Sequence, residues 1–288
     1  MIEVYLFLAV FLVQILAMSV LYPARLSRAI QASLKNIPAG RLAEFYPGVD
    51  VGRAHERFIT WYRIVNNVIA VLGLLLLCWF FSYMMQPDWD EGSVSGKLTA
   101  YFFLQNFPIV LFAGFTIRFN KVHRRSSQES KRKAVLQRRG LFDFVAPITV
   151  VLVVLSYSSF AAFMFYIARH PFPGFGGPLL NIGILSLAYM LFGFFVYRQV
   201  YGRKTDPLQT HADRMHATSV IVNTVAWVSI LIPVTASLSM ARQLLDLDRW
   251  GPFVGTAGFL ILGLLNIRMV STPRRQPEAI TVDSISTS

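Results

Sequence analysis

Hydrophobic residues along the chain gather into seven long runs separated by shorter polar segments. The runs cover residues 4–22, 64–85, 98–117, 144–167, 179–197, 218–239 and 252–270. A helix needs roughly 20 apolar residues to cross a hydrocarbon core of about 30 Å, and each run approaches or exceeds that length. Apart from Arg268 at the end of the last run, none contains Asp, Glu, Lys, Arg or His. The pattern predicts an all-α, polytopic membrane helix bundle of seven transmembrane helices, in one domain over residues 1–270.

The distribution of charge predicts how this bundle is oriented. Segments 23–63, 118–143, 198–217 and 268–288 hold 23 of the 27 Lys and Arg residues. The N-terminus and the segments near 86–97, 168–178 and 240–251 carry a small excess of acid instead. Lys and Arg in short loops stay on the cytoplasmic side, so the sequence predicts an outside N-terminus and a cytoplasmic C-terminus. The short loops and the absence of a targeting signal favour a bacterial inner membrane.

Two segments outside the runs have recognisable character. In the cytoplasmic segment 24–57, Leu26, Ile30, Leu34 and Ile37 recur on one side of a helix that would end at Pro38. This amphipathic helix is expected either to lie on the inner membrane surface or to pack against the inner ends of other spans. The polar tail 271–288 lacks an apolar face and is predicted to be disordered.

An internal repeat is a further hypothesis. Residues 56–74 align without gaps onto 213–231 with seven identities in nineteen, including Asn66 with Asn223. The repeat is either two parallel three-helix units joined by the fourth span, or three related hairpins preceded by the first span. The first arrangement is similar in topology to sugar carriers of the SWEET type, which are built from parallel repeats. The chain lacks the Pro-Gln dipeptides of those carriers, so the similarity is one of topology alone.

The runs lack the residues on which most membrane enzymes and redox proteins depend. The five histidines, His55, His123, His170, His211 and His216, all lie in loops or at the ends of runs, without metal-ligand spacing. The single cysteine, Cys78, has no partner in the chain. We therefore expect no catalytic residues, no metal and no cofactor.

Uncharged polar residues inside the runs are the candidates for a solute path. Gln105, Asn106 and Pro108 fall near the middle of the third run, where proline frees a backbone carbonyl beside two amides. Asn66 and Asn223 lie one to two turns from the inner face. Buried amides either hold a solute at mid-membrane or simply join neighbouring helices.

Other residues in the runs are expected to contribute less. Pro147 and Pro233 are expected to break two further helices. The hydroxyls of the Ser-Tyr-Ser-Ser stretch 156–159 can bond back to their own helix, so the stretch carries little weight as a site.

A second candidate surface is the basic segment 118–139. Its main candidates for docking are Lys131, Arg132, Lys133, Arg138 and Arg139. Positive loop charge at the cytoplasmic face accounts for this composition, and anionic lipids are the expected partners. No nucleic-acid-reading module accompanies it, so nucleic acid is not an expected partner.

The sequence thus supports two functions. One is a carrier or facilitator of a small neutral solute; without a buried carboxylate, passive exchange is favoured over proton coupling. The other is a non-catalytic subunit, scaffold or sensor that docks a protein partner, a second copy or anionic lipid on its basic face.

Overall fold

The computed structural model describes residues 2–35, 50–123, 140–172, 175–202 and 211–271, and throughout these ranges the regular structure is helical. The long helices are α1 (Ile2–Ile15), α2 (Tyr22–Lys35), α4 (Val51–Met84), α5 (Glu91–His123), α6 (Pro147–Ile167), α7 (Pro178–Tyr201), α8 (His211–Leu244) and α9 (Gly251–Ser271). A π-helical turn, η1 (Leu16–Leu21), joins α1 directly to α2. Single 3₁₀ turns, η2 (Leu141–Asp143) and η3 (Asp248–Trp250), precede α6 and α9.

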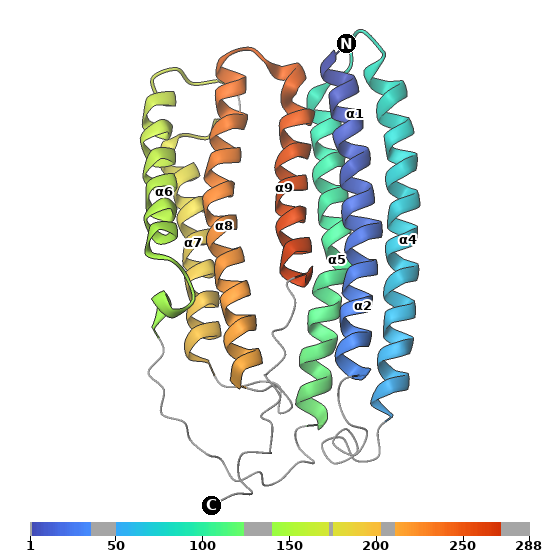
Figure 1. Ribbon diagram of the computed structural model, residues 1–288. Helices are drawn as coiled ribbons and strands as arrows, with labels where there is room; N and C mark the ends of the chain where they lie inside the picture. Colours follow the sequence, from blue (N-terminus) through green and yellow to red (C-terminus); the bar gives the residue numbers. More distant parts are fainter. Residues whose placement is uncertain (1, 36–49, 124–139, 173–174, 203–210, 272–288) are drawn as a thin grey trace, which may run out of the picture.

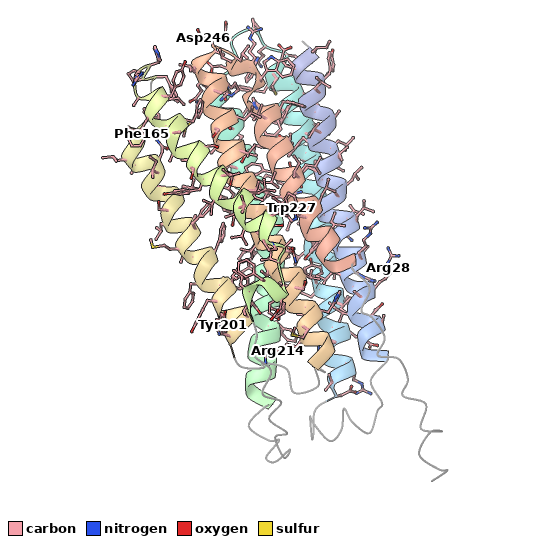
Figure 2. The ribbon with its side chains drawn as sticks, turned by 60° about the vertical axis from the view of Figure 1, so that its left-hand side comes forward. Arg28, Phe165, Tyr201, Arg214, Trp227 and Asp246 are labelled. Carbon is pink, nitrogen blue, oxygen red and sulfur yellow. The ribbon has the colours of Figure 1, made fainter. Side chains whose placement is uncertain are left out.

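The helices stand side by side and alternate in direction (Figure 1). The start of α1 and the connections α4–α5, α6–α7 and α8–α9 lie at the upper end in that view. Figure 2 shows Asp246 at this end, with Arg214 and Tyr201 toward the opposite end. The acidic residue Asp246 and the basic residue Arg214 thus lie toward opposite ends of the bundle.

Local sequence explains where several helices begin. The Asp50 carboxylate accepts a hydrogen bond from the Arg53 backbone N–H at 3.0 Å and caps α4. Pro147 and Pro178 occupy first-turn positions of α6 and α7, where proline costs no hydrogen bond. Pro147 thus begins α6, and the expected break inside the fourth span is wrong; Pro233 does lie inside α8.

The bundle consists of two packed groups. The first contains α1, α4, α5 and α9, whose core includes the rings of Phe7, Phe11 and Phe80 with centroids 5.3 to 5.8 Å apart. The second contains α6, α7 and α8. Contact between α8 and α9 joins the groups.

The amphipathic helix predicted near residue 24 is α2. It continues α1 through η1 and packs against α4 and α9. The later part of the predicted segment 24–57 includes residues 36–49, which lie outside the described residues, and then the start of α4. The tail from 272 onward lies outside them as well.

Five of the helical segments in the described part of the chain are long and apolar enough to cross a membrane. They are Ile2–Ala32, Val51–Met84, Pro147–Ile167, Pro178–Tyr201 and Arg214–Leu244. This confirms that the described chain is helical and that several of its helices are suited to crossing a membrane. The helices α5 and α9 coincide with the remaining two predicted spans and run alongside the five. The seven-span topology and the internal repeat stay predictions.

Candidate functional site

One polar cluster lies deep inside the first group of helices, around the predicted residue Gln105. The Gln14 side-chain amide on α1 donates to Gln105 Oε1 on α5 at 2.8 Å, and Gln105 Nε2 donates to Ser19 Oγ at 3.1 Å. All three side chains are buried, and Gln14 is fully so. Gln105 is therefore a link between α5 and the first helix.

The π-helical turn η1 accounts for the two partners of Gln105 on one helix. Positions five apart in an α-helix point about 140° away from each other, because each residue turns about 100°. A π-helix bonds residue i to residue i+5, so positions five apart lie close to the same side. Gln14 lies just before η1 and Ser19 lies within it, five residues later, and this local π-helical geometry lets both reach Gln105.

A tyrosine near this cluster ties α5 to α4. Tyr101 donates its hydroxyl to the Ile69 carbonyl at 3.1 Å. A Cβ on Gly73 would lie 2.1 Å from that hydroxyl oxygen, so only glycine leaves room for the contact. The polar interior of this group is thus used to join α1, α4 and α5.

The other predicted path residues bond mainly to backbone. Asn106 donates to the Phe102 carbonyl at 2.8 Å and Asn66 to the Tyr62 carbonyl at 2.7 Å, each within its own helix. Asn223 on α8 donates to the Phe144 carbonyl at 2.6 Å. Pro108 lies inside α5 and is buried. Among the described residues no hydrogen bond joins one of these path residues to another, and their role as a path stays a hypothesis.

A second polar cluster joins α6, α7 and α8 around Pro233; the sequence points to this proline and to the Ser-Tyr-Ser-Ser stretch of α6, but not to their partners on α7. Proline has no backbone N–H, so the carbonyl four residues earlier, that of Ser229, loses its helical partner. Tyr189 on α7 donates its hydroxyl to this carbonyl at 2.5 Å. Beside it, the hydroxyls of Tyr157 on α6 and Ser186 on α7 bond at 2.7 Å.

A pocket of about 480 Å³ lies between α6 and α8, next to Pro233. We call it the α6–α8 pocket. Its lining includes three serines, two phenylalanine rings and no charged residue; the polar and aromatic members are Ser156, Ser159, Ser237, Phe160 and Phe163. Such a volume lies within the range of small-molecule sites.

The serines of this pocket differ in how their hydroxyls are used. Ser156 donates to the Val153 carbonyl at 2.9 Å, as expected for a hydroxyl inside a membrane helix. Ser159 and Ser237, by contrast, have no hydrogen-bond partner among the described residues. Two free hydroxyls therefore line the pocket, one from each helix. Of the serines in the stretch 156–159, Ser156 thus bonds to its own helix, whereas Ser159 leaves its hydroxyl unused among the described residues.

A smaller pocket of about 360 Å³ lies between α6 and α7. Tyr157, Ser186 and Tyr189 line it, together with the apolar side chains of Val154 and Met190. All three hydroxyls here already bond to protein groups. This pocket therefore offers a ligand less unused hydrogen-bonding capacity than the α6–α8 pocket.

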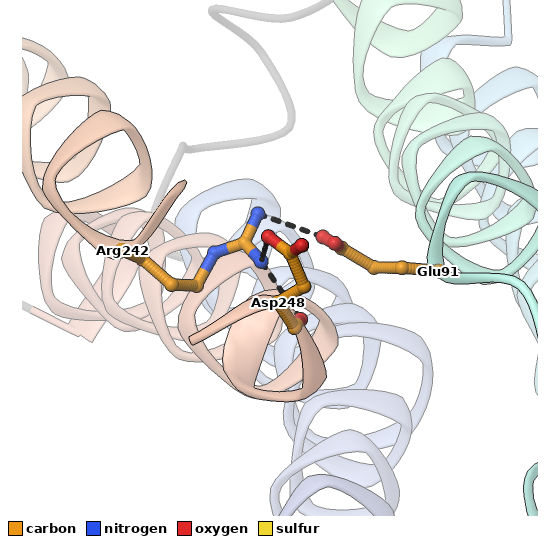
Figure 3. A network of polar contacts seen from close by, with 3 residues as sticks. All are labelled: Glu91, Arg242 and Asp248. Carbon is orange, nitrogen blue, oxygen red and sulfur yellow. Dashed lines mark hydrogen bonds and ion pairs between the residues drawn. The ribbon is translucent and has the colours of Figure 1, made fainter. Parts of the chain in front are cut away.

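An ion network joins the two groups at the end where α8 meets α9 (Figure 3). The Arg242 guanidinium, whose side chain is only 8% exposed, bonds Glu91 at 2.7 Å and the Asp248 carboxylate at 3.4 Å. It also donates to the Asp248 carbonyl at 2.7 Å. Because a carboxylate from α5 and one from η3 meet one buried cation, its charge is compensated within the protein.

The docking hypothesis falls on a part of the chain that the structure does not describe. Lys131, Arg132, Lys133, Arg138 and Arg139 lie outside the described residues. Across the described residues, no three His, Cys, Asp or Glu side chains gather as a metal site would require. The docking hypothesis stays open.

Comparison with known proteins adds no relative. No family model matches the chain, and no curated protein or solved structure matches it either.

Proposed function

We propose that this protein is a multi-pass membrane carrier or facilitator of a small, neutral, weakly polar solute, held in the α6–α8 pocket. The observation that carries the proposal is the pair of free hydroxyls, Ser159 and Ser237, in a pocket without charged lining. Because an unpaired charge is costly to bury, an uncharged pocket at membrane depth favours a neutral ligand.

The hydrogen bonds of the predicted amides are the reason for choosing this pocket over the third span. Gln105, Asn66 and Asn223 already bond to protein groups. A solute at those side chains would have to replace these bonds, whereas Ser159 and Ser237 offer hydroxyls at no such cost.

Pro233 gives α8 a point at which it can bend beside the bound solute. The missing N–H removes one helical hydrogen bond there, and the Ser229 carbonyl accepts a hydrogen bond from outside the helix, from Tyr189. Bending of α8 at this position would change the width of the α6–α8 pocket, which a carrier requires for exchange between two sides.

The proposal includes an orientation. In this proposal all seven predicted spans cross the membrane, with the start of α1 outside and the basic connections in the cytoplasm, following the charge distribution. A bacterial inner membrane is the proposed location.

Solute flux in proteoliposomes tests the proposal. Purified protein is reconstituted and screened with pooled polyols, sugars and other neutral solutes. We expect saturable flux that falls at least tenfold in Ser159→Leu/Ser237→Leu, because leucine removes the hydroxyls and fills the pocket. Ser158→Leu is the matched control, since Ser158 is exposed on the same helix and does not line the pocket.

Two outcomes would count against the proposal. Absence of saturable flux from a well-folded preparation would exclude the carrier role. Flux that survives in Ser159→Leu/Ser237→Leu and disappears in Asn106→Leu would move the path to α5, where the sequence first suggested it.

A further inference from the structure

We infer that the ligand of the α6–α8 pocket comes from the lipid phase and is a neutral amphiphile: an apolar body with a hydroxyl or ester carbonyl group. This inference rests on the proposed site and goes further in naming the class of ligand and its route of entry.

The pocket opens on the side of the bundle. Two of its lining residues on α8, Val234 and Leu238, are 51% and 55% exposed, and Ser159 on α6 is exposed as well. Residues exposed on the side of a membrane-spanning bundle face lipid chains. A molecule dissolved in the bilayer therefore reaches the pocket directly.

The lining explains which bilayer molecules the pocket selects. Lipid chains are as apolar as leucine, so burying a plain hydrocarbon against Phe160 and Phe163 yields little selectivity over the bilayer. The free hydroxyls of Ser159 and Ser237 supply the difference. In hydrocarbon a polar group has few partners, so a ligand hydroxyl or carbonyl gains from bonding to them.

The same lining disfavours charged lipids. The guanidinium of Arg242, one residue beyond the lining residue Ala241, is bound by Glu91 and Asp248. Its charge is therefore not available to a phosphate or carboxylate in the pocket. A neutral headgroup of the size of a glycerol ester matches both the charge and the volume of about 480 Å³.

Photolabelling in lipid nanodiscs tests the inference. The probe is a monoacylglycerol with a photoreactive diazirine near the ester, and labelled peptides are mapped after irradiation. We expect saturable labelling of peptides from α6 and α8, competed by unlabelled monoacylglycerol. A phosphatidylglycerol probe with the diazirine at the same depth should label this site at least fivefold less.

Paired variants separate the site from the general lipid surface. Ser159→Ala/Ser237→Ala removes the hydroxyls without filling the pocket, and should lower apparent affinity about tenfold, as expected for two hydrogen bonds of about 0.7 kcal/mol each. Ser158→Ala, and Tyr157→Phe in the neighbouring pocket, should leave labelling unchanged. Melting temperatures of the variants confirm that each is folded.

The outcomes distinguish this inference from the carrier role. Saturable labelling without flux supports the lipid-phase ligand and removes the carrier proposal. Flux of a water-soluble polyol, with labelling that is non-saturable or equal in Ser159→Ala/Ser237→Ala, overturns the lipid-phase ligand and leaves a carrier. Uniform labelling of all outward helix faces would likewise overturn it.

Discussion

Side-chain amides inside the bundle donate hydrogen bonds either within one helix or between helices, and this difference decides how much each bond contributes to tertiary stability. Asn66 and Asn106 donate to carbonyls of their own helices and so link nothing else through these bonds. Gln14 and Gln105 bond across two helices with both side chains buried. Only the second kind contributes to tertiary stability, because the first is available in the isolated helix.

We expect Gln14 and Gln105 to be energetically coupled. Interhelical hydrogen bonds in membrane proteins contribute about 0.6 kcal/mol on average and up to about 1.7 kcal/mol. Gln14→Leu and Gln105→Leu should each destabilise the protein, and a double-mutant cycle measured by unfolding in bicelles should give coupling of about 1 kcal/mol. Asn106→Leu is the control, with a smaller loss expected. Additive effects of the two Gln variants would show that their bond contributes nothing.

Sequence reasoning reached Gln105 but not its partners, for a geometric reason. With α-helical periodicity, Gln14 and Ser19 point in different directions, so neither looks like a partner of the same residue. The π-helical turn Leu16–Leu21, which contains Ser19, changes the register, and it has no proline or glycine by which the sequence could predict it. The sequence points to Ser159 only as part of the stretch 156–159 and not to Ser237 at all, because whether a hydroxyl lacks a partner depends on the neighbouring helices.

At the scale of elements, Pro233 removes one hydrogen bond from α8, and a side chain on the neighbouring α7 replaces it. The sequence predicts which carbonyl proline frees, since it lies four residues earlier, at Ser229. Which group donates to that carbonyl depends on the packing of α7 against α8, which places the Tyr189 hydroxyl 2.5 Å from the Ser229 carbonyl oxygen. The packing itself could not be read from periodicity.

The Tyr189 bond to the Ser229 carbonyl predicts that Pro233→Ala reduces the cost of losing the Tyr189 hydroxyl. Tyr189→Phe should destabilise the protein by about 1 kcal/mol, because the freed Ser229 carbonyl then loses the Tyr189 hydroxyl as its donor. In a Pro233→Ala background the helix supplies its own N–H, and Tyr189→Phe should cost less than half as much. Thermal unfolding of the four proteins in detergent measures the cycle. An equal cost in both backgrounds would contradict the assigned bond.

The ion network at the α8–α9 turn predicts a second effect between elements. Glu91→Gln should destabilise the bundle by about 2 kcal/mol, because it leaves buried Arg242 with only the more exposed Asp248 as counter-charge. The double variant Glu91→Gln/Arg242→Gln should recover part of that loss. Asp246→Asn, also in this turn, serves as the control, and melting temperature is the measurement.

The same network explains why a glycine begins α9. A Cβ at Gly251 would meet Glu91 Oε1 at 1.9 Å and Arg242 Cζ at 2.8 Å, so Gly251→Ala should disrupt both. Gly96→Ala in α5 has open space around its Cβ and should be neutral or slightly stabilising. A melting temperature for Gly251→Ala no lower than that for Gly96→Ala would show that the network tolerates displacement.

For the whole molecule, hydropathy predicts where the helices lie along the chain, but it does not predict how the helices pack against one another. Each of the seven apolar runs corresponds to a helical segment of the described residues, because a long apolar run favours a helix that buries its own backbone polar groups. The grouping of α6, α7 and α8 apart from α1, α4, α5 and α9 is set by interhelical contacts that leave no such regular signature. The α6–α8 pocket arises from that grouping, and so it could not be predicted.

The topology prediction is most sharply tested at α5 and α9, which the five membrane-length apolar segments do not include. Cys78 is exposed on α4, so Cys78→Ala provides a cysteine-free background at little cost. Asp88→Cys and Ser126→Cys flank α5, and Asp246→Cys and Ser284→Cys flank α9. We expect a membrane-impermeant maleimide to label the first member of each pair in intact cells and the second only after permeabilisation. If both members of a pair were labelled from the same side, the helix between them would not cross the membrane. The prediction of seven spans with the termini on opposite sides would then be wrong for that helix.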